Sequence, residues 1–199
     1  MSKPETKGNK REIILETAKM IFAEKGFDGS RMDEIAERAG VKKSLIYYHF
    51  DGKDHLLQEI LNQFFEEFGE LLRSETTSER ENNKYMDFMD KNSDLLRVIL
   101  IESLKKNTKL TSIFKAVNML MEYENERMDE LNPMQYPSNH KRWVAEFFTN
   151  MLPSVGYICY KDAWCSYFSV DKETLEKDYF EAYAETHGQY HNNISASVQ

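Results

Sequence analysis

Proline and glycine are scarce in this sequence, and one long stretch contains no proline at all. The 199 residues include four prolines and eight glycines, and no proline lies between Pro4 and Pro133. Because proline interrupts the interior of helices and strands, its absence favours long helices. Apolar residues recur at helical spacing through the chain, and they predict an all-α fold of about nine helices.

Cysteines and long apolar runs are equally sparse. Cys159 and Cys165 are too few for a zinc site, and their spacing on one helix suits a disulfide poorly. No apolar run reaches the roughly 18 residues that a membrane-spanning helix needs. The polar start MSKPETKGNKRE lacks the apolar segment of a signal peptide. We therefore expect a cytoplasmic protein with reduced thiols and no membrane contact.

Motifs of catalysis and metal binding are also missing. The sequence contains neither a glycine-rich phosphate loop nor an HExxH zinc motif. His187 and His191 lie one helical turn apart, but no third metal ligand accompanies them. The sequence therefore predicts no enzyme, no cofactor and no metal site.

Positive charge is not in excess overall, because the formal net charge is −8. The charge is unevenly distributed, however. Residues 1–55 contain eleven Lys and Arg against ten Asp and Glu, a net charge of +1, so residues 56–199 carry −9. A weakly basic N-terminal segment on an acidic body suits a protein that contacts DNA with one side only.

Residues 31–53 contain two short amphipathic segments separated by a glycine. Gly40 can leave the first helix with a positive φ, and the small Ala36 lets a second helix cross closely. The apolar stripes consist of Met32, Ile35, Ala36 and Ala39 in the first segment and of Leu45, Ile46 and Phe50 in the second. The pattern predicts a helix-turn-helix, whose second helix can enter the major groove of DNA.

The polar residues of the second helix are hydrogen-bond donors and include no acid. Residues 42–44 are predicted to contact base edges or phosphates, and residues 47–49 and 53 to contact the backbone. Ser30 is also the expected N-cap of the first helix. The predicted DNA-binding residues are Ser30, Arg31, Lys42, Lys43, Ser44, Tyr47, Tyr48, His49 and Lys53. The alternatives are a solvated basic turn in an ordinary three-helix unit and, for Lys53, an exposed lysine beside Asp54.

The run from Ile13 to Leu57 resembles the tetracycline-repressor (TetR) family of bacterial transcription regulators. The similarity rests on FAEKGFDGS, DEIAERAGV, LIYYHF and the residues at 53, 54, 56 and 57, about a quarter of the chain. The remainder resembles the family in length, helical pattern and order. The resemblance implies an N-terminal helix-turn-helix domain, a C-terminal helical domain that binds ligand and dimerises, and a repressor that binds a palindromic operator as a homodimer.

The expected domains are residues 1–52, which bind DNA, and residues 53–199, which bind ligand and dimerise. Residues 1–9 are expected to be mobile, although their lysines would also suit a phosphate backbone. A helix over 53–73 is predicted to link the two domains. Further helices are expected over 10–25, 82–91, 94–106, 110–131, 139–168 with either a kink or one broken hydrogen bond at Pro153, and from a cap at Asp171 to 193.

The body is rich in methionine and aromatic residues, which favours an adaptable pocket for a small, largely apolar effector. Glu146 and Asn150 would fix the orientation of a ligand, unless they face solvent or another helix. Glu102 would either neutralise a cationic ligand or pair with an arginine. The candidate ligand-binding residues are Met89, Glu102, Phe114, Met121, Trp143, Glu146, Phe147, Asn150 and Met151.

The last two predicted helices carry another apolar stripe. In the resembled family these helices pair with their copies, and symmetric half-sites on DNA require two copies in fixed relation. The predicted interface residues are Val155, Ile158, Tyr179, Phe180, Tyr183, His187 and Tyr190. The alternative is a stripe that packs inside one chain.

The sequence therefore predicts a ligand-responsive transcription regulator that binds an inverted repeat in double-stranded DNA. A helical carrier or sensor that has lost DNA binding is the main alternative. Acids or prolines in the second helix of the helix-turn-helix would indicate that DNA binding has been lost, and residues 42–49 contain none. A helical enzyme would need a buried polar constellation, which the sequence does not show.

Overall fold

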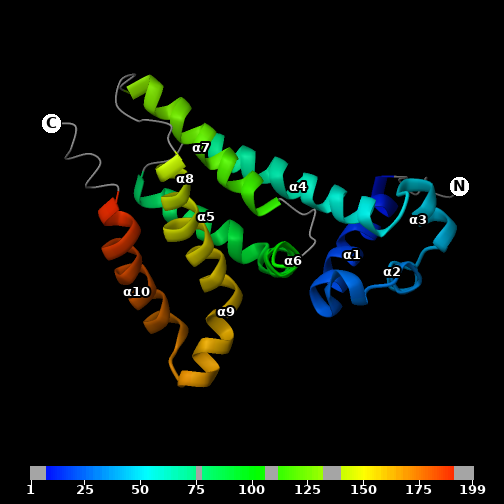
Figure 1. Ribbon diagram of the computed structural model, residues 1–199. Helices are drawn as coiled ribbons and strands as arrows, with labels where there is room; N and C mark the ends of the chain where they lie inside the picture. Colours follow the sequence, from blue (N-terminus) through cyan, green and yellow to red (C-terminus); the bar gives the residue numbers. More distant parts are fainter. Residues whose placement is uncertain (1–7, 75–77, 106–111, 132–139, 191–199) are drawn as a thin grey trace, which may run out of the picture. The chain divides into compact units, whose positions relative to one another are not determined.

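A computed structural model describes residues 8–74, 78–105, 112–131 and 140–190, and the regular structure in these ranges is entirely helical (Figure 1). The helices are α1 (Gly8–Gly29), α2 (Met32–Arg38), α3 (Lys43–His49), α4 (Lys53–Arg73), α5 (Ser78–Lys91), α6 (Ser93–Ser103), α7 (Ser112–Leu131), α8 (His140–Ala145), η1 (Glu146–Met151), α9 (Leu152–Phe168), α10 (Lys172–Tyr183) and η2 (Ala184–Gly188). The segments α8, η1 and α9 are continuous, as are α10 and η2, so nine separate helices lie in the described ranges. The predicted all-α fold is confirmed, while residues 1–7 of the expected mobile start and the end of the last predicted helix lie outside these ranges.

Several helix limits follow from local chemistry. The helix predicted over 53–73 is present as α4 with the same bounds. Asp171 caps α10 as predicted, because its Oδ1 accepts a hydrogen bond from the Thr174 N–H at 2.9 Å. Gly26 has a φ of 71°, in the left-handed region that favours glycine, and interrupts α1 where its end was predicted.

The helix predicted over 139–168 changes type before Pro153. The segment η1 is a π-helix, and the Leu152 N–H donates to the Phe147 carbonyl, five residues earlier. Pro153, which has no N–H to donate, then lies in the first turn of α9. The predicted kink is therefore a widened turn that ends just before the proline.

Internal contacts divide the chain into two units. The first comprises Met1–Glu70 and Asp94–Ser112, and the second comprises Leu71–Ser93 and Ile113–Gln199. This grouping places most of α4, and α6, with the helix-turn-helix. The predicted boundary after residue 52, between a DNA-binding and a ligand-binding domain, concerns function and stays a prediction.

The first unit has an apolar core to which each of its N-terminal helices contributes. Side chains of α1, α2, the end of α3 and α4 are almost completely buried: Ile14, Leu15, Ile21, Phe22, Ile35, Ile46, Phe50, Leu56 and Leu61. Leu95 and Ile99 of α6 are buried as well. This core fixes the orientation of α3, which presents the predicted DNA-binding residues.

The second unit contains an antiparallel hairpin of α9 and α10 (Figure 1). Its buried apolar residues include Val117, Met121, Val155 and Ile158, and its buried polar residues include Glu146 and His187. Helix α10, in contrast, has no buried residue. Across the described ranges, no helix has the length and apolarity to cross a membrane.

Tyr157 and Tyr179 join α9 to α10, and they lead to a prediction for alkaline pH. Their rings stack with centroids 4.2 Å apart, and burial, reinforced by the charge of Glu176, raises the pKa of Tyr157 to about 12. The folded state therefore favours the protonated phenol, so this contribution to stability is present below about pH 10 and is lost as the pH rises towards 12. We expect a late phenolate component in an absorbance titration at alkaline pH, and its loss in Tyr157→Phe. Ionisation of every tyrosine near pH 10 would contradict this.

Candidate nucleic-acid interface

Gly40 makes the turn between α2 and α3 possible. Its φ is 63°, a conformation that residues with a Cβ rarely adopt. The Gly40 N–H donates to the Glu37 carbonyl at 3.1 Å, and the Val41 N–H donates to the Ala36 carbonyl at 3.0 Å. These two bonds satisfy the last carbonyls of α2 and reverse the chain in a Schellman motif. The glycine predicted as the turn residue therefore sets the direction of α3.

Helix α3 has one buried and one exposed face. Ile46 is completely buried, and Phe50, which caps the helix, is buried too. Tyr48 is 80% exposed and Tyr47 is 49% exposed. The predicted DNA-binding residues that are exposed are Arg31, Lys42, Lys43, Ser44, Tyr47 and Tyr48, whereas His49 is half-buried. The structure thus brings five donors of residues 42–48 to the solvent side of a firmly anchored helix.

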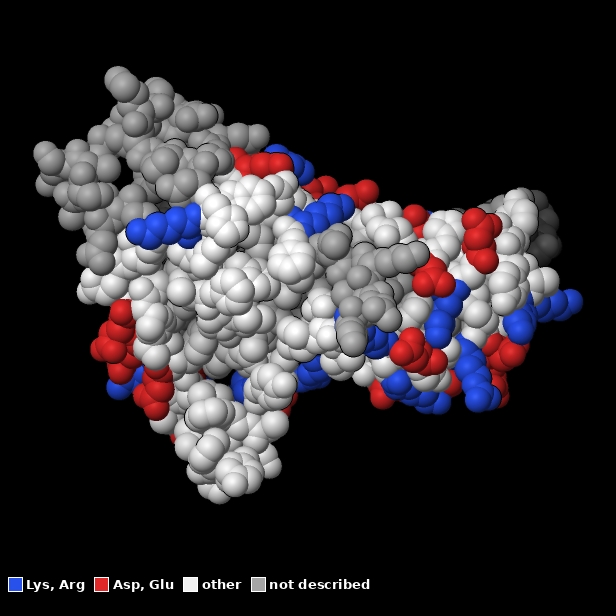
Figure 2. Space-filling view, viewed as in Figure 1, with Lys and Arg blue, Asp and Glu red and all other residues white. Residues whose placement is uncertain are grey.

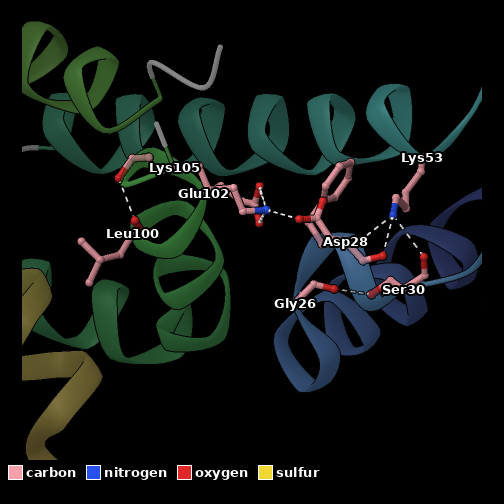
Figure 3. A network of polar contacts seen from close by, with 9 residues as sticks. Gly26, Asp28, Ser30, Lys53, Leu100, Glu102 and Lys105 are labelled. Atoms are coloured by element: carbon pink, nitrogen blue, oxygen red, sulfur yellow. Dashed lines mark hydrogen bonds and ion pairs between the residues drawn. The ribbon is translucent and has the colours of Figure 1, made fainter. Parts of the chain in front are cut away.

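Ser30 has a different role from the one predicted. It is only 3% exposed, and its hydroxyl donates to the Gly26 carbonyl at 2.6 Å and to the Ile21 carbonyl at 3.2 Å (Figure 3). The N-cap of α2 is Arg31, which makes no capping hydrogen bond with its side chain. The expected N-cap at Ser30 is therefore wrong, because the hydroxyl is used to close the end of α1. Its burial also argues against a direct contact between this side chain and DNA.

Lys53 is likewise engaged within the first unit. Its Nζ donates to the carbonyls of Phe27 at 2.6 Å and Ser30 at 3.1 Å, and it lies 4.4 Å from the centre of the Phe27 ring (Figure 3). The first residue of α4 thus holds the turn between α1 and α2. Neither the predicted phosphate contact nor the alternative of an exposed lysine beside Asp54 describes this geometry. A phosphate contact by Lys53 would require its ammonium to leave these carbonyls.

Lys105 connects the same turn to the end of α6. Its Nζ lies 2.6 Å from Asp28 Oδ2 and 2.6 Å from Glu102 Oε1 (Figure 3). Hydrogen bonding to Lys105 lowers the pKa of Asp28, and hydrogen bonds to Asp28 and Glu102 raise the pKa of Lys105. Glu102, predicted to meet a cationic ligand or an arginine, therefore pairs with a lysine of its own chain.

The acids of α2 pair with cations around the helix-turn-helix. Glu34 Oε1 lies 2.7 Å from Lys25 Nζ and 3.2 Å from Arg38 Nη2. Asp33 Oδ1 lies 2.7 Å from Lys43 Nζ, at the start of α3. Hydrogen bonding to Asp33 raises the pKa of Lys43. The predicted interface thus carries charges of both signs, which agrees with the small net charge of this part of the chain. On the face shown in Figure 2, acidic and basic side chains are likewise interspersed.

Polar residues predicted as ligand contacts meet inside the second unit. Glu146 is completely buried, and its Oε2 accepts a hydrogen bond from Asn150 Nδ2 at 3.0 Å and lies 3.4 Å from His187 Nε2. The Tyr183 hydroxyl donates to Asn150 Oδ1 at 2.9 Å. These contacts join η1 to α10 and η2. Glu146 and Asn150 therefore face another helix, which was the alternative to a ligand contact. In the described ranges, no group of three or more His, Cys, Asp or Glu is placed to hold a metal ion.

The other predicted ligand contacts are spread between core and surface. Met121 is 1% exposed, whereas Phe114 is 57% and Trp143 is 41% exposed. The Phe114 and Phe147 rings lie 5.3 Å apart and bring α7 to η1. Met89 and Met151 are half-buried. A ligand role for this set stays a prediction.

Part of the predicted dimer stripe packs inside one chain. Val155, Ile158 and His187 are at most 5% exposed, so in this conformation they offer little surface to a partner. Tyr179 stacks on Tyr157, and its hydroxyl lies 3.2 Å from Ser154 Oγ. Phe180, Tyr183 and Tyr190 are half-buried. Most residues of this stripe thus pack inside one chain, which was the alternative to a dimer interface.

An exposed aromatic cluster, which was not predicted from the sequence, lies at the end of α9. Its members, with their exposed fractions, are Tyr160 (64%), Trp164 (50%), Tyr167 (82%) and Phe168 (54%). On the face shown in Figure 2, the projecting end of the α9–α10 hairpin carries few charged side chains. The spacing of three and four between these residues is a signal that the sequence contains, but the predicted interface residues of this helix were Val155 and Ile158.

Comparison with known proteins identifies the N-terminal segment. The family model described as "Bacterial regulatory proteins, tetR family" matches residues 14–60. Residues 14–60 are therefore similar to the tetR family of bacterial regulatory proteins. The match begins in α1 and ends in α4, so it contains the whole helix-turn-helix and the core that supports it.

Curated proteins similar to this segment include negative transcriptional regulators of a biofilm operon. The chain is 32% identical to IcaR of Staphylococcus epidermidis over 62 residues, which are 31% of this chain and 34% of that protein. It is 36% identical to IcaR of Staphylococcus aureus over 56 residues, 28% of this chain and 30% of that protein. The aligned part therefore spans about a third of the length of these relatives.

Solved structures extend the similarity of fold beyond this segment. A tetR-family regulator from Streptomyces coelicolor has a TM-score of 0.65 at 14% identity, with 96% of this chain and 87% of that chain covered. FadR of Bacillus subtilis, solved in complex with stearoyl-CoA, has a TM-score of 0.61 at 18% identity, with 87% and 97% covered. At these identities the similarity concerns the fold.

Proposed function

We propose that this chain is a sequence-specific DNA-binding regulator of transcription that acts as a repressor in the cytoplasm. The observation that carries the proposal is the exposed donor face of α3, with Lys42, Lys43, Ser44, Tyr47 and Tyr48, on a helix anchored by Ile46 and Phe50. Lysine and hydroxyl groups are suited to phosphate oxygens and to base edges in the major groove. The IcaR relatives, which are negative regulators of transcription, support the repressor reading.

The regulator is proposed to act as a homodimer on an inverted repeat. A single short recognition helix reads few bases, and a two-fold dimer doubles the site with half-sites about one DNA turn apart. Helix α10 has no buried residue in its own chain, and the aromatic cluster at the end of α9 is exposed. We place the contact between copies on these two helices, with Tyr160, Trp164, Tyr167 and Phe168 added to the half-buried Phe180, Tyr183 and Tyr190.

A small, largely apolar effector is proposed to bind the second unit and shift the DNA-competent population. FadR of Bacillus subtilis shows that a protein of similar fold binds an acyl-CoA. An effector weakens DNA binding only through its differential affinity for the two states, and a hundredfold effect needs about 2.7 kcal/mol. Because α4 runs from the helix-turn-helix into the second unit, it is the continuous element through which such a shift would pass.

An in vitro selection on random duplex DNA tests the DNA-binding proposal directly. At about 0.15 M salt, we expect the purified protein to enrich an inverted repeat whose half-site centres lie about one turn apart or slightly more. A non-inverted, single site would contradict the dimer. Weak, salt-sensitive binding without enrichment would instead favour a helical carrier that has lost operator recognition.

A further inference from the structure

We propose that Asp33 competes with DNA phosphate for Lys43 and thereby limits the affinity of the recognition helix for DNA. The inference rests on the proposed DNA-binding function and assigns a regulatory residue to that interface. Asp33 Oδ1 lies 2.7 Å from Lys43 Nζ. The pair joins the first turn of the scaffold helix α2 to the first residue of the recognition helix α3.

The pair lies where DNA would compete with it. Lys43 is predicted to contact DNA, and its side chain is 47% exposed, while that of Asp33 is 74% exposed. Water and a phosphate group therefore have access to the ammonium without any rearrangement of the fold. A backbone phosphate that binds Lys43 either displaces the carboxylate or shares the ammonium with it, and in both cases two anions come close together.

The neighbouring charges single out Asp33. The other acid of the first turn of α2, Glu34, faces Lys25 and Arg38, on α1 and α2. Lys42, one residue before Lys43, forms no ion pair with any residue that the structure describes. Of the ion pairs formed within the described ranges, the Asp33–Lys43 pair is the one that reaches α3. Lys42 and Lys43 therefore differ in how readily they are available to DNA.

This difference has a consequence for salt dependence. A lysine that binds DNA normally releases about 0.9 of a condensed cation per phosphate neutralised. Lys43 is already neutralised by Asp33, so its transfer to phosphate leaves a carboxylate that attracts a cation in turn. The carboxylate therefore offsets part of the cation release that Lys43 would otherwise cause. Lys43 should consequently add less to the salt slope of the wild-type protein than an unpaired lysine does.

The experiment compares Asp33→Asn with the wild-type protein on two duplexes of about 30 base pairs, one with the selected inverted repeat and one with a scrambled sequence. We expect the variant to bind both duplexes roughly three- to tenfold more tightly, since a phosphate contact carries no sequence information. The slope of log K against log salt should steepen, by at most about 0.9 per protomer. Circular dichroism and the melting temperature serve as checks on the fold, because an acid in the first turn favours α2.

Two further variants distinguish the effect of the Asp33–Lys43 pair from the effect of removing any negative charge from α2. Glu37→Gln removes one negative charge from an exposed position of the same helix, and we expect it to leave the salt slope unchanged. In a Lys43→Met background, Asp33→Asn should no longer steepen the slope. Equal effects of Asp33→Asn and Glu37→Gln, or an Asp33→Asn effect that persists without Lys43, would overturn the inference. Absence of salt-dependent binding by the wild-type protein to either duplex would instead overturn the proposed function.

Discussion

Replacing Trp164 by glutamate is expected to convert the proposed dimer into a monomer and to weaken operator binding by at least a hundredfold. Trp164 is 50% exposed within the aromatic cluster, with the Phe168 ring centroid 4.6 Å away. A carboxylate placed there would have to be desolvated in a contact between copies, which is costly without a partner. Once the copies separate, the second half-site is no longer held at high effective concentration, a loss of about 10²- to 10⁴-fold in affinity.

The measurement pairs sedimentation of the free protein with titration of the inverted-repeat duplex. Phe148→Glu is the matched control, since Phe148 is 59% exposed on η1, outside the aromatic cluster. We expect this control to remain dimeric and to bind DNA as the wild-type protein does. A Trp164→Glu protein that sediments as a dimer would move the contact away from the end of α9.

The helix-turn-helix was predictable from sequence because several local signals agree there. Gly40 occupies the one position of the turn that needs a positive φ, and Ile35, Ala36 and Ile46 are buried as their spacing predicted. Such signals depend on neighbours within a few residues. The same is true of the cap at Asp171 and of the start of α4 at Lys53, both of which the structure has as predicted.

The roles of Ser30 and Lys53 were not predictable, because they depend on where carbonyls from other turns lie. Ser30 has the chemistry of an N-cap, yet its hydroxyl bonds backward to Gly26 and Ile21. Lys53 has the chemistry of a phosphate contact, yet its ammonium is held by the carbonyls of the α1–α2 turn. Side-chain type indicates what a group can bind, whereas the partner is chosen by the fold.

The dimer stripe shows a second limit of periodicity. Spacings of three and four identify an apolar face, but they do not say whether the same chain or another copy covers it. Val155 and Ile158 are covered by their own chain, whereas Trp164, one and a half turns further along α9, is not. Exposure in the folded chain is what separates the two classes, and it requires the arrangement of α9 against α10.

Truncation of Phe50 is expected to have the largest effect on the first unit. Phe50 is completely buried, its ring contacts those of His49 and His55, and the Arg11 guanidinium lies 5.3 Å from its centre. Phe50→Ala would remove the side chain that joins the end of α3 to α1 and α4. Such substitutions cost about 3–5 kcal/mol, a large part of the roughly 5–15 kcal/mol that stabilises a typical domain.

Tyr48→Ala is the matched control, because Tyr48 lies two residues earlier and is 80% exposed. Chemical denaturation should show a change of less than about 0.5 kcal/mol for Tyr48→Ala, as is usual for surface positions. DNA titration should nevertheless show weaker binding by this variant, since its hydroxyl lies on the proposed DNA face. The two variants thus separate the anchor of the recognition helix from its reading surface. Unchanged DNA binding by Tyr48→Ala would remove Tyr48 from that surface, and an unchanged free energy of unfolding for Phe50→Ala would contradict the position of α3 in the core.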